Sequence, residues 1–159
     1  MSKTAVHRRR RRPAPAQPDL VRQLVPGAQS HATAGRPSPG HLIEAVRAGL
    51  PVAEFDALRE LLGVSIERLA GMLGLGKATL HRRRLQGRLQ TPESDRLLRY
   101  ARLLGRATEV MGSLEAGRDW LLAPQAGLGG AVPLDYAATE VGAREVEELL
   151  GRIEHGVYS

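Results

Sequence analysis

The chain has 159 residues and a formal net charge of +6, with 23 Lys and Arg against 17 Asp and Glu. The absence of cysteine excludes disulfides, thiolate metal sites and cysteine nucleophiles. Aromatic residues make up only 3%, which argues against a binder of single-stranded nucleic acid, because such proteins stack bases on aromatic side chains. No apolar run approaches the roughly 20 residues of a membrane span, and nothing resembles a signal peptide. We therefore expect a soluble, cytoplasmic protein that does not bind a membrane.

The charge is distributed unevenly along the chain. Residues 1–90 hold 16 basic and 6 acidic side chains, whereas residues 91–159 hold 7 basic and 11 acidic ones. The first part is electrostatically suited to a polyanion and the second is not. This difference favours a protein with one part for nucleic acid and another part for a different partner, although a chance asymmetry within one domain would look the same.

Residues 1–39 are predicted to form a disordered basic arm. They contain six of the ten prolines and the arginine run Arg8–Arg12, and they show no sustained apolar period. The arginines would favour nearby phosphates without reading sequence. A solvated, solubilising tail is an equally good interpretation.

From His41 onward, apolar residues recur at three- and four-residue spacing, which predicts an all-α fold. The helix at 92–111 has the clearest start, with Thr91 as the expected capping hydroxyl and Pro92 in the first turn. The expected helices are 42–48, 51–62, 66–73, 77–84, 92–111, 114–122, 133–139 and 142–154. Residues 40–90 are assigned to a helix-turn-helix domain, and residues 91–159 to a second helical domain.

A helix-turn-helix is predicted at residues 65–84. The small Ala70 lets a second helix cross closely, Gly74 permits the turn, and Leu80 fills the joint. Arg83 stands where many such motifs have an apolar residue. We therefore expect a short second helix in which Leu85 takes over the packing. A plain helical hairpin is the alternative.

The second helix and its exit are rich in groups that bind DNA. Arginine pairs with guanine through two hydrogen bonds, and Thr or His can contact other base edges. We expect base contacts from Thr79, His81 and Arg82. Phosphate contacts, which fix register without reading sequence, are expected from Lys77, Arg83, Arg84 and Arg88. A merely solvated basic helix is the alternative.

Roughly residues 50–159 resemble the Xre-type antitoxins of RES–Xre (MbcT–MbcA-like) toxin–antitoxin pairs. The arginine-rich arm lies outside this resemblance. Beyond the helix-turn-helix, it rests on three segments that occur together: Glu93-Ser94-Asp95-Arg96-Leu97, Gly129-Gly130…Pro133-Leu134-Asp135 and Gly151-Arg152-Ile153-Glu154…Gly156.

The resemblance implies an antitoxin that binds operator DNA of its own operon, forms a homodimer and obstructs the active site of a RES-domain toxin that consumes NAD. It makes residues 91–159 a dimerisation and toxin-binding domain. The 92–111 helix is the candidate dimer element, or equally part of the monomer core. The candidate toxin-binding residues are Leu149, Arg152, Ile153, Gly156, Val157 and Tyr158. Core packing is the alternative for Leu149 and Ile153, and a solvated helix-end cation for Arg152.

No catalytic or metal-binding pattern emerges. The five histidines do not lie at ligand spacing from one another, and no phosphate-binding loop or catalytic triad is apparent. We therefore expect no enzyme activity, no cofactor and no metal. The alternatives to an antitoxin are a stand-alone dimeric helix-turn-helix regulator with no toxin partner, and a structural partner with vestigial DNA binding.

Overall fold

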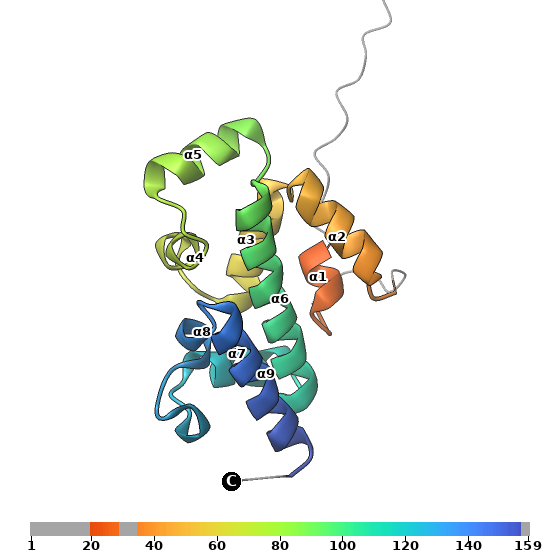
Figure 1. The fold of residues 1–159 in the computed structure, drawn as a ribbon, viewed down its shortest axis with the longest axis vertical. Coiled ribbons are helices and arrows are strands. Elements are labelled where there is room, and N and C mark those ends of the chain that lie inside the picture. The colour runs from red at the N-terminus through yellow and green to blue at the C-terminus, as the bar shows by residue number, and fades with distance from the viewer. Residues whose placement is uncertain (1–19, 29–34, 157–159) are drawn as a thin grey trace, which may run out of the picture.

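A long helix, α6 (Thr91–Met111), runs through the middle of the molecule (Figure 1). The computed structural model describes residues 20–28 and 35–156. The other helices are α1 (Leu20–Leu24), α2 (Pro39–Ala48), α3 (Val52–Leu62), α4 (Ile66–Met72), α5 (Lys77–Gln86), α7 (Leu114–Leu122), α8 (Pro133–Tyr136) and α9 (Glu140–Glu154), with a 3-10 turn at Ala126–Leu128.

The all-α prediction is confirmed for the part of the chain that the structure describes. No strand forms there, and β-type pairing is confined to two isolated bridges, between Pro51 and Arg88 and between Gln125 and Ala131. None of the described helices is both long enough and apolar enough to cross a membrane.

The start of α6 differs in detail from the sequence prediction. Gln90, and not Thr91, precedes the helix, and its backbone N–H donates to Oε2 of Glu93 at 2.8 Å. Thr91 is the first helical residue, so the prediction that its hydroxyl caps the helix is wrong. Pro92 does lie in the first turn, where its missing N–H costs nothing. Gly112, with φ +88°, ends the helix in the left-handed conformation that glycine adopts most readily.

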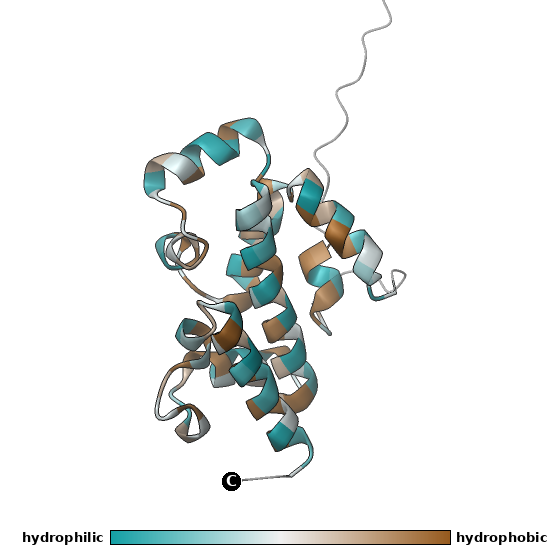
Figure 2. Cartoon of the chain, in the orientation of Figure 1, coloured by the Kyte–Doolittle hydropathy of each residue, from teal (hydrophilic) through white to brown (hydrophobic). Residues whose placement is uncertain are grey.

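The interior face of α6 forms the core of the monomer. Leu97, Ala101, Leu103, Leu104 and Ala107 are all fully buried. The helices α2 and α3 pack around its N-terminal half, α1 packs against it at Gly105, and α7 and α9 pack along its C-terminal half (Figures 1 and 2). These apolar side chains are thus covered within one chain, as the core interpretation of this helix predicted.

The backbones of α6 and α7 approach closely at Gly117. A Cβ atom placed there would lie 2.6 Å from the backbone nitrogen of Thr108, closer than side-chain carbons come to other heavy atoms. Only glycine therefore allows the two helices to cross at this distance.

Part of the region expected to be disordered is folded. The helix α1 buries Leu20, Val21 and Leu24 against α3 and α6. The buried carboxylate of Glu54 on α3 accepts the backbone N–H groups of Leu20 and Val21, each at 2.9 Å. The prediction of a disordered arm over 1–39 is therefore wrong for residues 20–28, because a carboxylate distant in sequence caps this single turn. The arginine run Arg8–Arg12 lies outside the described residues.

Candidate nucleic-acid interface and carboxy-terminal surface

The helices α4 and α5 form the predicted helix-turn-helix. Ser65 caps α4, since its hydroxyl accepts the backbone N–H of Arg68 at 3.1 Å. In the turn, Gly74 adopts φ +71° and the N–H of Leu75 donates to the carbonyl of Ala70 at 2.8 Å. Ala70 and Leu80 are both buried at the joint. The turn and the packing thus follow the pattern read from the sequence.

One face of α5 is buried and the opposite face is open to solvent. Only two of its side chains, Leu80 and Arg83, are buried. Thr79 is half-buried. The exposed residues of the helix are Lys77, Ala78, His81, Arg82, Arg84, Leu85 and Gln86. Apart from Arg83, the basic side chains of α5 therefore all reach solvent.

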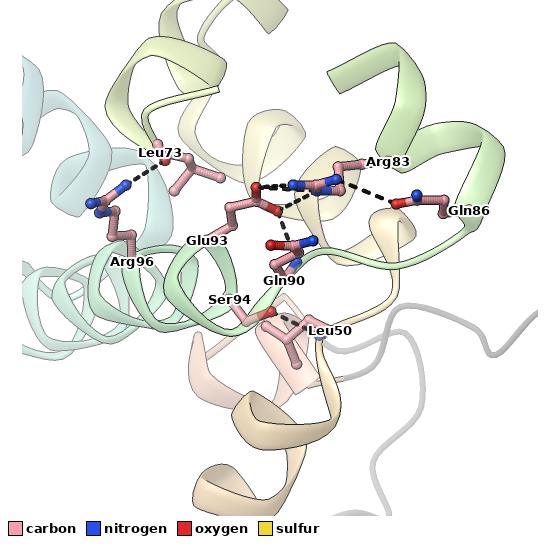
Figure 3. A network of polar contacts seen from close by, with 8 residues as sticks. All are labelled: Leu50, Leu73, Arg83, Gln86, Gln90, Glu93, Ser94 and Arg96. Atoms are coloured by element: carbon pink, nitrogen blue, oxygen red, sulfur yellow. Dashed lines mark hydrogen bonds and ion pairs between the residues drawn. The ribbon is translucent and has the colours of Figure 1, made fainter. Parts of the chain in front are cut away.

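Arg83 occupies the inward position that the sequence pattern reserves for an apolar residue (Figure 3). It is 5% exposed, and its Nε donates to both oxygens of Glu93, at 2.9 and 3.1 Å. One terminal nitrogen donates to Oε1 of Glu93 at 2.9 Å, and the other donates to Oε1 of Gln86 at 3.3 Å. Because all three guanidinium nitrogens have partners inside the protein, we withdraw Arg83 from the phosphate contacts predicted from the sequence.

The same ion pair explains why α5 is longer than the sequence predicts. Arg83 fills the inward position, so α5 continues to Gln86 and does not end at Arg84. Leu85 is 77% exposed, and the prediction that it takes over the packing is wrong. An apolar side chain thus lies on the open face of α5, which the sequence reasoning missed.

Opposing effects act on the pKa of Glu93. Burial alone would raise it, but hydrogen bonds from Arg83 and from the backbone N–H of Gln90, together with the charge of Arg83, outweigh burial and lower it. The pKa of Arg83 is raised, chiefly by the hydrogen bond to Glu93. The pair therefore stays ionised at neutral pH.

Arg84 and Arg88 lie at the surface but also bind neighbouring parts of the chain. The two terminal nitrogens of Arg84 donate to the two oxygens of Asp56, both at 2.9 Å, and the guanidinium lies 5.8 Å from the ring centre of Phe55. Arg88 donates to the carbonyl of Gly49 at 2.7 Å. Both side chains are exposed to solvent, as are those of Lys77 and Arg82.

The carboxy-terminal surface contains only some of the predicted residues. Leu149 is 9% exposed and belongs to the core, where a Cβ at Gly127 would lie 2.6 Å from its Cδ1. We therefore remove Leu149 from the candidate toxin surface, because its apolar atoms are already covered. Arg152 and Ile153 are half-buried, and Gly156 is exposed. Val157 and Tyr158 lie outside the described residues.

An ion pair that the sequence analysis did not anticipate holds the last turn of α9 on α6. Both terminal nitrogens of Arg106 donate to the carboxylate of Glu154. This hydrogen bonding lowers the pKa of Glu154 and raises that of Arg106. This ion pair therefore joins the last turn of α9 to α6.

Both halves of the chain match known domain families. Residues 41–102 match the antitoxin Xre-like helix-turn-helix domain, and residues 106–156 match the antitoxin Xre/MbcA/ParS C-terminal toxin-binding domain. A protein named Antitoxin Xre from Yersinia enterocolitica is 32% identical over 121 residues, which cover 74% of this chain and 81% of that relative. The chain belongs to the Xre antitoxin family.

A second Antitoxin Xre, from Photorhabdus laumondii, is 31% identical over 131 residues, covering 80% of this chain and 88% of that relative. The Xre antitoxins are a non-enzymatic class. The toxin-binding match favours an antitoxin over a stand-alone regulator. Among the described residues of this Xre-family chain, no group of three or more His, Cys, Asp or Glu side chains could hold a metal ion.

Proposed function

We propose that this Xre-family antitoxin represses its own operon through α4 and α5, and that its carboxy-terminal end blocks the active-site mouth of a RES-domain toxin that consumes NAD. Inhibition is steric, and this chain performs no chemistry. The protein acts in the cytoplasm as a homodimer, whose two-fold symmetry would match a palindromic operator.

The observation that carries the DNA-binding part is the exposed basic face of α5. His81 and Arg82 lie on this face, where they can reach base edges in a major groove. Lys77, Arg84 and Arg88 are also exposed, and we assign them to phosphate contacts. Thr79, which is half-buried, is the remaining candidate for a base contact.

The toxin-binding part rests on the family match of residues 106–156 and on the exposed end of α9. Arg152 and Ile153 are partly open to solvent, and Gly156 follows them at the surface. Val157 and Tyr158 extend this set from the sequence alone. In this proposal Ile153, Val157 and Tyr158 exclude water from the toxin's active-site mouth, and Arg152 pairs with an acid or occupies an anion site.

The test is to co-express the chain with the product of the adjacent gene, purify through a tag on one partner and measure NAD loss. A stable complex with suppressed NAD loss is expected. Chains truncated after Gly151 should lose the protection and keep their binding to the duplex upstream of the gene. The matched variant Arg82→Ala should keep the protection and lose its preference for the duplex upstream of the gene. Full protection by the truncated chain, or unsuppressed NAD loss with the intact chain, would contradict the proposal.

A further inference from the structure

The helix α5 presents the candidate base-reading residues but is itself held by few side chains. Only Leu80 and Arg83 on this helix are buried. Leu80 packs into the joint with α4, and it is the only apolar side chain of α5 that is buried. The orientation of the exposed face therefore depends on polar contacts, of which Arg83 makes the buried one, with Glu93, and Arg84 the exposed one, with Asp56.

The contact that Arg83 makes is directional. Three of its hydrogen bonds go to the Glu93 carboxylate, between 2.9 and 3.1 Å, so that the planar guanidinium and the carboxylate lie fork to fork (Figure 3). Glu93 is itself fixed in the first turn of α6 by the N–H of Gln90 at 2.8 Å. The pair thus joins α5 to the first turn of the long helix α6.

The residues beside Glu93 hold two other parts of the helix-turn-helix domain. The hydroxyl of Ser94 accepts the N–H of Leu50, in the connection between α2 and α3, at 2.9 Å. Arg96 donates to the carbonyl of Leu73, at the end of α4, at 3.0 Å (Figure 3). A Cβ at Gly74 would lie 2.8 Å from the same guanidinium nitrogen, so Arg96 lies directly against the turn. The start of α6 therefore binds three separate segments through three side chains that lie within four consecutive positions.

We infer that Arg83 and Glu93 are positioning residues for DNA recognition: their ion pair sets the angle at which α5 presents His81 and Arg82, and Arg83 contacts no phosphate. This inference rests on the proposed DNA-binding function. Buried ion pairs add little net stability, but they can select one geometry over others. A lysine at position 83 would keep the charge but would lose the two-pronged contact.

The experiment compares conservative substitutions of the two paired residues with one outside the proposed DNA-binding surface. The binding of the full-length variants Arg83→Lys and Glu93→Gln, and of the control Arg144→Lys, is measured on the duplex upstream of the gene and on a scrambled duplex. Positioning predicts that Arg83→Lys and Glu93→Gln each lower the ratio of the two affinities about tenfold, the effect of one lost base contact. Arg144→Lys should leave this ratio unchanged, because this exposed side chain on α9 lies outside the proposed DNA-binding residues and its charge is kept.

A direct phosphate contact by Arg83 makes the opposite predictions. Arg83→Lys would then keep the affinity ratio, and Glu93→Gln would release a cation and strengthen binding to both duplexes. Either result would overturn the inference. If Arg83→Lys does not fold, Glu93→Gln decides by itself, because its amide has nearly the same shape as the carboxylate and still accepts hydrogen bonds.

Amide hydrogen exchange provides a second measurement that needs no DNA. In Glu93→Gln, the amides of α5 should exchange at least several-fold faster than in the wild type, while those of α6 and α9 stay protected. Unchanged protection of α5 would refute the role of the pair. If the wild type does not prefer the upstream duplex, the proposed operon repression fails, but the exchange experiment still decides whether the pair holds α5.

Discussion

Substituting Ser94 with alanine tests the junction between α6 and the amino-terminal helices. Ser94 is fully buried and Leu50 is 2% exposed, so the 2.9 Å bond between the Leu50 N–H and the Ser94 hydroxyl is shielded from water. Removing the acceptor leaves a buried donor unpaired, which costs about 1–3 kcal/mol. The higher helix propensity of alanine returns up to about 0.7 kcal/mol. The expected loss in unfolding free energy is thus roughly 1–2 kcal/mol.

Urea unfolding followed by circular dichroism measures this loss, and the thermal midpoint should fall by roughly 3–8 °C. The matched control is Thr91→Ala, in the same turn of α6. The Thr91 hydroxyl is exposed and only 3.5 Å from the carbonyl of Arg47, so its loss should cost less than about 0.5 kcal/mol. A Ser94→Ala variant as stable as this control would refute the reasoning, because the buried N–H would then have found another partner.

Three other predictions concern packing, pH and DNA. Gly117→Ala should lower the unfolding free energy by about 1–3 kcal/mol. The control Gly151→Ala should be neutral or slightly stabilising, because no atom lies within 4 Å of the added Cβ at this helix position. Equal urea midpoints for the two variants would contradict this prediction. Because the pKa of Glu93 is lowered by folding, its stabilisation is present above the ordinary glutamate pKa of about 4.3 and is lost as pH falls further. Urea midpoints measured against pH should therefore fall more steeply for the wild type than for Glu93→Gln, and parallel curves would argue against the pair. Arg82→Ala should reduce the preference for one DNA sequence over another, while Arg88→Ala should weaken binding to all DNA. The slope of log affinity against log salt concentration should fall by about 0.9 in Arg88→Ala, and a wild-type slope in this variant would contradict the phosphate contact.

The sequence determined the helices and the motif because these depend on nearby residues. The apolar spacing, the prolines and the glycines that end helices are local signals, and they predicted all-α structure and the bounds of most helices to within a few residues. The Ala70, Gly74 and Leu80 spacing likewise predicted the helix-turn-helix. Each of these signals acts within one or two turns of the chain.

The tertiary structure decided which polar groups are inside. Arg83 departs from the apolar pattern, and the sequence alone suggested a shorter helix. Only the folded chain brings the carboxylate of Glu93, at the start of α6, to Arg83 and leaves Leu85 outside. The same holds for α1, which is too short to be stable alone and which Glu54 caps from 33 and 34 residues away. Buried charges need partners. The partners of the two buried charges, Arg83 and Glu54, lie on other helices, and the spacing of residues along the chain does not indicate them.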